Sequence, residues 1–145
     1  MGKISYVGRS LMPDEYIALR AAAGLPPLDY TQAAMATRMD LFSVVVLTED
    51  SVPIGGCRVL GDGVTALYLQ DLVVAPKYRR HGVGTKIVEL VFSWIAAKAA
   101  PGALVGLLAA PGTESFFAKL GFAARPAEAP GMVLAGASHP TAGNA

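Results

Sequence analysis

Cysteine, charge and long apolar runs are all scarce in this sequence. Cys57 is the only cysteine in 145 residues, so the chain can form no disulfide within itself. Charged residues make up 16% of it and the net charge is +1, which argues against nucleic acid as a partner. No uninterrupted apolar run reaches membrane-spanning length, and residues 1–7 contain no apolar segment of signal length. We therefore expect a cytoplasmic protein that binds neither nucleic acid nor membrane, since a lone thiol is compatible with a reducing compartment.

Apolar side chains, by contrast, are abundant. Hydrophobic residues make up 53% of the sequence, which is far too many for a disordered chain. A chain of this length can bury one ordinary core. We predict a single domain over residues 1–136 and a flexible tail over residues 137–145, whose His139 would face solvent.

Strand and helix patterns follow one another along this domain. Runs rich in β-branched residues predict strands at 4–7, 41–48, 53–60, 64–74, 103–109 and 131–135. Helical spacing and capping residues predict helices at 13–23, 32–39, 87–95 and 114–119. Met35 and Met39 share one helix face, where they either pack in the core or line an apolar substrate pocket. The order of elements predicts an α/β (α+β) fold with a mixed sheet flanked by helices.

The stretch from Leu67 to Ile95 is the most informative part of the sequence. An apolar strand ends at Pro76, a basic glycine-containing turn follows, and an amphipathic helix comes next. The first amides of a helix have no partner within it and carry partial positive charge, so strand, glycine turn and helix together form a phosphate cradle. The glycines fit neither the Walker loop nor the Rossmann fingerprint.

Two motifs in this region resemble those of a known family. The turn from Arg79 to Gly84 fits the pattern Arg/Gln-x-x-Gly-x-Gly/Ala, and residues 116–122 are similar to Phe-Tyr-x-Lys-x-Gly-Phe. In this the chain resembles the GNAT superfamily of N-acetyltransferases over roughly residues 41–122. The resemblance implies a mostly antiparallel sheet splayed at the acetyl-CoA site, acetyl-CoA as co-substrate, no metal, and transfer to a primary amine of a small molecule. It leaves open a possible homodimer, a protein amine as acceptor, or a CoA-binding sensor with little turnover.

The resemblance also implies a donor site, residue by residue. The pantetheine arm would pair with the backbone of the strand that precedes the turn, and the pyrophosphate would sit on amides of the turn. Phe117 occupies the second motif. The cofactor-binding residues implied in this way are Leu72, Val73, Val74, Arg79, Arg80, His81, Gly82, Val83, Gly84, Thr85 and Phe117.

The residues for the chemical steps are less clearly marked. An NH near Val73 is the best candidate donor to the oxyanion, since it would point at the thioester oxygen where the strand diverges. Phe117 stands where the family has a tyrosine acid, and it has no proton to give. The thiolate would then leave unprotonated, or Tyr68 or Tyr30 would substitute for the missing tyrosine.

Asp71 is the candidate general base. Alternation along the strand predicts Tyr68, Gln70 and Leu72 on one face and Leu69, Asp71 and Val73 on the other. Between apolar neighbours the pKa of its carboxyl would be raised toward a useful value. The alternative is that it bonds to nearby backbone and orders the sheet.

Overall fold

The structure is a computed structural model that describes residues 2–134. Contacts divide the chain into two compact units, Met1–Leu108 and Ala109–Ala145, and each is described by itself. The predicted tail with His139, and residue 135 of the predicted last strand, lie outside the described residues. Among residues 2–134, no helix is long and apolar enough to cross a membrane.

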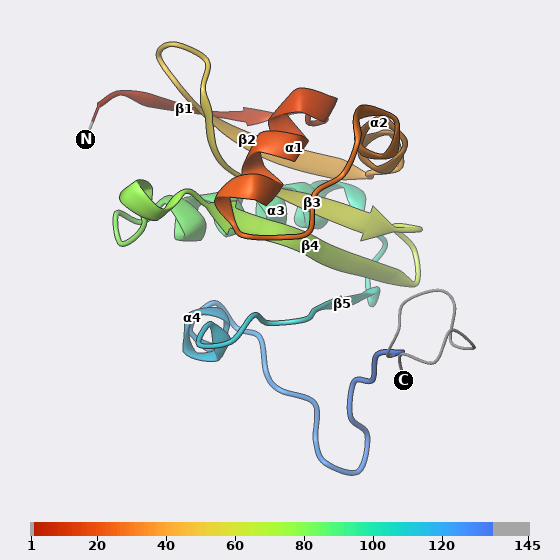
Figure 1. Cartoon of the computed structure of the whole chain (residues 1–145). Coiled ribbons are helices and arrows are strands. Elements are labelled where there is room, and N and C mark those ends of the chain that lie inside the picture. Colours follow the sequence, from red (N-terminus) through yellow and green to blue (C-terminus); the bar gives the residue numbers. More distant parts are fainter. Residues whose placement is uncertain (1, 135–145) are drawn as a thin grey trace. The chain divides into compact units, whose positions relative to one another are not determined.

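A five-stranded sheet forms the centre of the first unit (Figure 1). Its strands are β1 (Ile4–Gly8), β2 (Phe42–Thr48), β3 (Pro53–Gly61), β4 (Ala66–Val74) and β5 (Leu104–Leu107), side by side in that order. The pairs β1–β2, β2–β3 and β3–β4 are antiparallel, and β4–β5 is parallel. This confirms the predicted mixed, mostly antiparallel sheet flanked by helices.

Helices cover both faces of this sheet (Figure 1). On one side lie α1 (Pro13–Ala22) and α2 (Tyr30–Arg38), and on the other lies α3 (Val83–Lys98), which follows the short 3-10 helix η1 (Pro76–Tyr78). Proline at the start of α1, and a capping box between Asp29 and Gln32 at the start of α2, explain where those helices begin. Four apolar residues of α3 are fully buried: Val83, Ile87, Val88 and Val91.

Two neighbouring glycines of β3 let the helices on both sides pack closely on the sheet. A Cβ added to Gly56 would lie 2.8 Å from the Val44 carbonyl oxygen and 3.2 Å from a Leu19 methyl group of α1. A Cβ added to Gly55 would instead approach Ile87 of α3, so the two positions mark opposite faces of β3.

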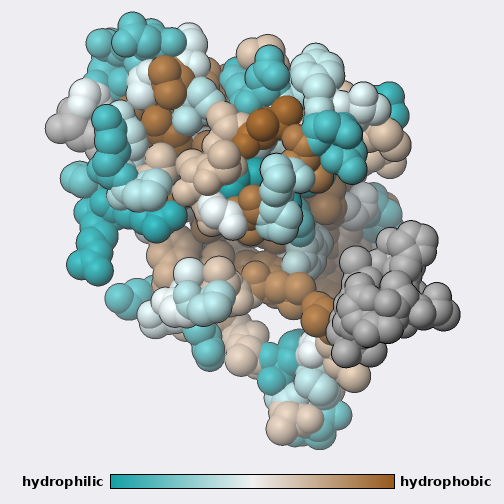
Figure 2. All heavy atoms as spheres, viewed as in Figure 1, coloured by the Kyte–Doolittle hydropathy of each residue, from teal (hydrophilic) through white to brown (hydrophobic). Residues whose placement is uncertain are grey.

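The methionines of α2 do not pack in the core as the first interpretation predicted. Met35 is 55% exposed and Met39 is 70% exposed. The buried positions of this short helix are Ala33 and Thr37, which lie four apart on another face. Over the part formed by α1, α2 and the first strands, apolar patches are interrupted by polar residues rather than continuous (Figure 2).

The second unit contains one helix, α4 (Glu114–Lys119), among its described residues. Phe117 is buried there and packs edge-on against Phe116 and Phe122, with ring centroids 5.1 and 5.8 Å away. The predicted strand at 131–135 is wrong over its described residues, because 131–134 have no strand structure and their apolar side chains are exposed. Strand propensity alone does not make a strand when no neighbouring strand pairs with it.

Candidate functional site

The sheet splits open along the second half of β4. Pairing with β5 runs only from Ala66↔Leu104 to Leu69↔Leu107, so within residues 2–134 no strand pairs on that side with the positions of β4 after Leu69. On the other side pairing with β3 continues to Val74. The last residues of β4 therefore present a free backbone edge, which confirms the predicted splay of the sheet.

A β-bulge at Asp71 sets which groups face that edge. The register with β3 shifts between Gly56 and Arg58, and Asp71 has a φ of 55°. Before the bulge, the Ala66 carbonyl accepts from Asp62 on the β3 side. After it, the Ala75 amide donates to the Ile54 carbonyl at 2.8 Å, also on the β3 side. The backbone amides and carbonyls of even-numbered residues thus point toward β3 before the bulge, and those of odd-numbered residues point toward β3 after it.

The bulge decides which NH near Val73 could serve as the predicted oxyanion donor. Val73 lies two residues before Ala75, so its amide and carbonyl also point toward β3, where Val73 pairs with Gly56. The Val73 carbonyl oxygen would indeed lie 3.1 Å from a Cβ on Gly55. The backbone groups that face the free edge belong to Leu72 and Val74, so the Val73 amide is not available to an oxyanion.

The bulge also overturns the predicted faces of the strand. Gln70 pairs with Arg58, whose side chain reaches Tyr16 of α1, while Val73 packs in the same cluster as Tyr16. Tyr68 is two residues before Gln70 and shares its face. The structure therefore brings Tyr68, Asp71 and Val73 to the α1 side together, because one inserted residue cancels the alternation.

The glycine turn is a set of backbone donors without acceptors. Within the described part of the chain, the amides of the six residues from Arg80 to Thr85 donate no hydrogen bond, and the first helical bond runs from Lys86 to the Gly82 carbonyl at 3.0 Å. No side chain caps α3, whose N-cap Gly82 has a φ of 78°. Arg80 is also left-handed, at 63°. Successive amides in such a turn, at the positive end of a 16-residue helix, form an anion site.

Side chains of the turn brace it from within. The Arg79 Nε donates to the Val74 carbonyl at 2.8 Å, and His81 Nδ1 lies 2.7 Å from the Arg79 carbonyl oxygen. Lys77 lies over the Tyr78 ring, with its ammonium 5.3 Å from the ring centroid. Because Nδ1 already contacts the turn, a phosphate contact by His81 would have to use the other edge of the ring. That contact remains a prediction.

A buried polar network on the α1 side was not predicted. The Tyr16 hydroxyl donates to Asp71 Oδ2 and accepts from Arg58 at 2.7 Å. Arg58 in turn forms an ion pair with Asp40 at 2.9 Å, and Arg20 approaches Asp71 Oδ2 at 3.6 Å. Burial, then the hydrogen bond to Asp71, raises the pKa of Tyr16. The signal in the sequence was Arg58, a cation inside an apolar strand, which requires an acid nearby.

Asp71 does not lie between apolar neighbours as predicted. Its Oδ2 faces Tyr16 and two guanidinium groups, and its Oδ1 has Gln70 at 3.3 Å. These contacts favour the interpretation that it orders the sheet, and its role as a base remains a prediction. Tyr68 is nearby, and burial raises the pKa of its hydroxyl, with Asp71 adding to the shift. Tyr30, the other substitute acid, is 59% exposed.

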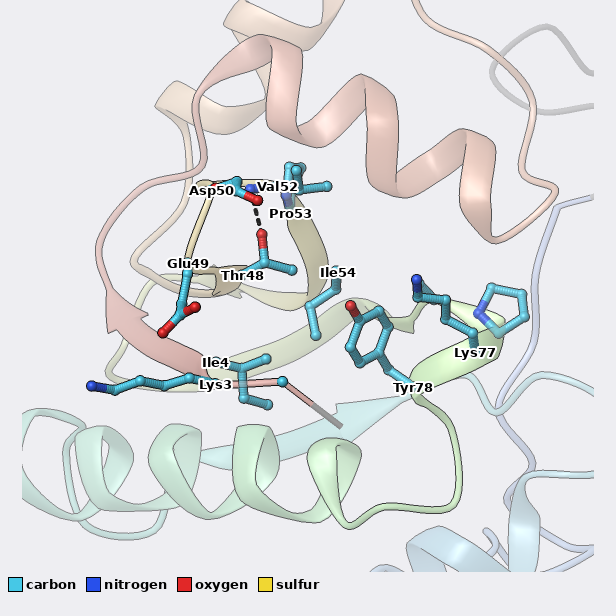
Figure 3. Close-up of a pocket in the computed structure, with 13 residues that line it drawn as sticks. Lys3, Ile4, Thr48, Glu49, Asp50, Val52, Pro53, Ile54, Lys77 and Tyr78 are labelled. Carbon is cyan, nitrogen blue, oxygen red and sulfur yellow. Dashed lines mark hydrogen bonds between the residues drawn. The ribbon is translucent and has the colours of Figure 1, made fainter.

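A separate pocket of about 680 Å³ lies where β1 starts, β2 turns into β3 and η1 begins (Figure 3). Ile4 and Ile54 contribute apolar side chains, Tyr78 points toward it, and Lys3 and Glu49 lie at its margin (Figure 3). No residue of β5 lines it, so it is distinct from the split. The described residues contain no group of three His, Cys, Asp or Glu side chains placed to hold a metal ion.

Comparison with known proteins gives consistent results. A family model described as an acetyltransferase (GNAT) domain matches residues 40–124. The chain is 27% identical over 122 residues to GCN5-related N-acetyltransferase 1, chloroplastic, from Arabidopsis thaliana, covering 83% of this chain and 61% of that protein. It thus spans less than two thirds of that relative.

Solved structures show the same fold. A protein of unknown function from meticillin-resistant Staphylococcus aureus, described as a probable acetyltransferase, is 26% identical with a TM-score of 0.82, covering 90% of this chain and 98% of that one. AAC(6')-Iy, solved with the bisubstrate analogue CoA-S-monomethyl-acetylneamine, is 17% identical with a TM-score of 0.65, covering 84% and 92%.

Proposed function

The chain belongs to the GNAT family of acetyltransferases, and on that premise we propose that it transfers an acetyl group from acetyl-CoA to a primary amine of a small molecule. The amine nitrogen attacks the thioester carbonyl directly while both substrates are bound, the carbon–sulfur bond breaks, coenzyme A leaves as thiolate, and the proton lost by the amine passes to water. The observation that carries this proposal is the adjacency along the chain of six unpartnered amides, Arg80 to Thr85, and the free edge of β4.

The donor substrate is held by backbone rather than by side chains. Its pyrophosphate lies on the amides of the turn, where Arg80 and Lys77 add positive charge. Its pantetheine arm is an extended chain of amides, and it pairs with Leu72 and Val74 as a further strand would pair with a free edge. The Arg79 side chain, bound to the Val74 carbonyl, fixes the junction between the two parts.

The Leu72 amide is the donor that we assign to the oxyanion. It precedes Val74 by two residues and therefore points the same way, one step farther into the split. A preorganised amide stabilises the negative charge that develops on the thioester oxygen when the amine attacks. This assignment specifies the donor, for which the sequence predicted only an NH near Val73.

Tyr68 is the group that we assign to the departing thiolate. Its pKa is raised by burial, so its hydroxyl keeps its proton and can donate a hydrogen bond to sulfur. It lies on β4 opposite Gly106, in the second-to-last residue pair before β4 and β5 separate. Phe117 offers no hydroxyl for this purpose.

Two measurements test the proposal. Calorimetry should detect coenzyme A binding, and a panel of primary amines with acetyl-CoA should include acceptors that release free thiol and form an acetylated product identified by mass spectrometry. Reactions without amine control for hydrolysis. Binding without thiol release for any amine, small or protein-borne, would identify a sensor instead of an enzyme; absence of binding would remove the proposal altogether.

A further inference from the structure

The bulge in β4 adopts a backbone conformation that its own strand does not favour. Asp71 has a φ of 55°, in the left-handed region that residues other than glycine seldom adopt, although aspartate and asparagine tolerate it best. Cys57 on β3 faces the inserted residue, since the register resumes at Gly56. Something outside the strand must therefore hold Asp71 in place.

The contacts of Asp71 identify that support. The Tyr16 hydroxyl donates to its Oδ2, and Arg58 and Arg20 each place a guanidinium nitrogen 3.6 Å from the same oxygen. Tyr16 is only 3% exposed and comes from α1, fifty-five residues away in the sequence. One carboxylate oxygen of Asp71 is thus contacted by side chains from helix α1 and from strand β3.

The groups that support Asp71 are themselves held firmly. Arg58 donates to both Asp40 oxygens at 3.0 and 3.1 Å and to the Ala36 carbonyl at 3.0 Å. Arg20 donates twice to the Pro26 carbonyl, at 3.0 and 2.8 Å. Among the described residues, no buried side-chain nitrogen or oxygen lacks a hydrogen-bond partner. A fully satisfied buried network of this kind is rigid.

We propose that Tyr16 is a positioning residue: through Asp71 it holds the bulge that turns the amides of Leu72 and Val74 toward the free edge of β4. Without the inserted residue, the alternation that begins at Ala66 would continue and direct Leu72 and Val74 at β3. The free edge would then present the amides and carbonyls of the odd-numbered residues instead of those of Leu72 and Val74. This inference rests on the proposed function, because it assigns the support of the same donor site.

The test compares two ligands that share only part of the site. Coenzyme A should contact both the turn and the strand edge, whereas its fragment 3′-phospho-ADP lacks the pantetheine arm and should contact the turn alone. For Tyr16→Phe we expect calorimetry to show that the affinity for coenzyme A falls by about tenfold, which corresponds to the loss of one hydrogen bond between the ligand and the strand edge. The affinity for the fragment should stay unchanged. Acetyl transfer at saturating substrates should fall by up to about a hundredfold, as expected when reacting groups shift by an ångström.

Tyr6→Phe is the matched control, since it removes one hydroxyl from β1 at the far edge of the sheet. It should leave both affinities and the transfer rate unchanged. If Tyr16→Phe lowers the melting temperature but leaves the ratio of the two affinities and the rate unchanged, Tyr16 is merely structural and the proposal is wrong. If the wild-type protein binds neither ligand, the proposed function itself has failed.

A second pair of variants keeps the proposal testable should Tyr16→Phe not fold. Asp71→Gly and Asp71→Ala both remove the carboxylate, but only glycine adopts a positive φ without strain. We expect Asp71→Gly to retain the coenzyme A to fragment affinity ratio and Asp71→Ala to lose it. Equal loss of turnover in the two variants with the ratio retained would instead identify Asp71 as a base, and an unchanged ratio in both would overturn the positioning role.

Discussion

Replacing Gly82 by aspartate should separate the stability of the fold from its affinity for coenzyme A. Gly82 is the N-cap of α3 and has a φ of 78°, and an added Cβ would meet no heavy atom within 4 Å. The protein itself therefore has room for the side chain. The cost to folding is the left-handed backbone, about 1 kcal/mol, offset in part by the favourable position of an anion at a helix start, about 0.5 kcal/mol.

The cost to binding is much larger, because the same space is where the diphosphate should lie. A carboxylate about 4 Å from one phosphate charge is repelled by about 4 kcal/mol at an effective dielectric constant of 20. Since about 1.4 kcal/mol corresponds to a factor of ten, coenzyme A should bind at least about a thousandfold more weakly. Thermal melting should nevertheless change by only a few degrees.

Gly82→Asn is the matched control, because asparagine has nearly the same shape, tolerates a positive φ and carries no charge. Calorimetry with coenzyme A on both variants, at one fixed ionic strength, isolates the electrostatic part. If the two variants bind coenzyme A equally well, the diphosphate does not lie over Gly82 and the cradle has been misplaced.

Three further predictions concern other parts of the chain. The hydrogen bond from Arg9 lowers the pKa of Glu15, so this carboxylate stabilises the fold above its ordinary pKa of 4.5 and stops doing so as the pH falls through its lower folded value. Glu15→Gln should therefore make the melting temperature depend less on pH at the acid end. A pH profile of the melting temperature identical to that of the wild type would contradict this. Burial raises the pKa of Cys57 to about 12, so native protein should react with a thiol reagent only as fast as it unfolds; rapid labelling of folded protein would refute this. Phe117→Tyr should fold with a melting temperature within about 5 °C of wild type, whereas an unfolded variant would count against the alignment of the second motif.

Local signals made the donor turn predictable from sequence. Pro76 ends the strand, Gly82 and Gly84 interrupt the pattern, and the helix that follows is periodic, so three independent features agree on one place. The splay of the sheet was different in kind, since it came from the resemblance to a family and not from any residue in β4. The structure confirms the strand, turn and helix geometry and the splay, while donor binding at the turn stays a prediction.

The bulge at Asp71 could not be predicted by the same means. A strand with one inserted residue reads like an ordinary strand until the support from Tyr16 is known, and that support comes from a distant helix. As a result the sequence predicted only an NH near Val73 as oxyanion donor, and the proposal that it is the Leu72 amide required the structure. The last predicted strand is wrong over residues 131–134 for a related reason, because a pairing partner is a property of the fold and not of the local sequence.

The stacked pair of Phe42 and Trp94 has a practical consequence. Their rings lie 5.3 Å apart and within 6° of parallel, and Trp94 is the only tryptophan in the chain. It lies on α3, the helix whose first amides donate no hydrogen bond, and contacts Phe42 of β2. Tryptophan emission from this protein thus reports one contact, so a spectral change during a coenzyme A titration would show whether the packing of α3 on the sheet changes.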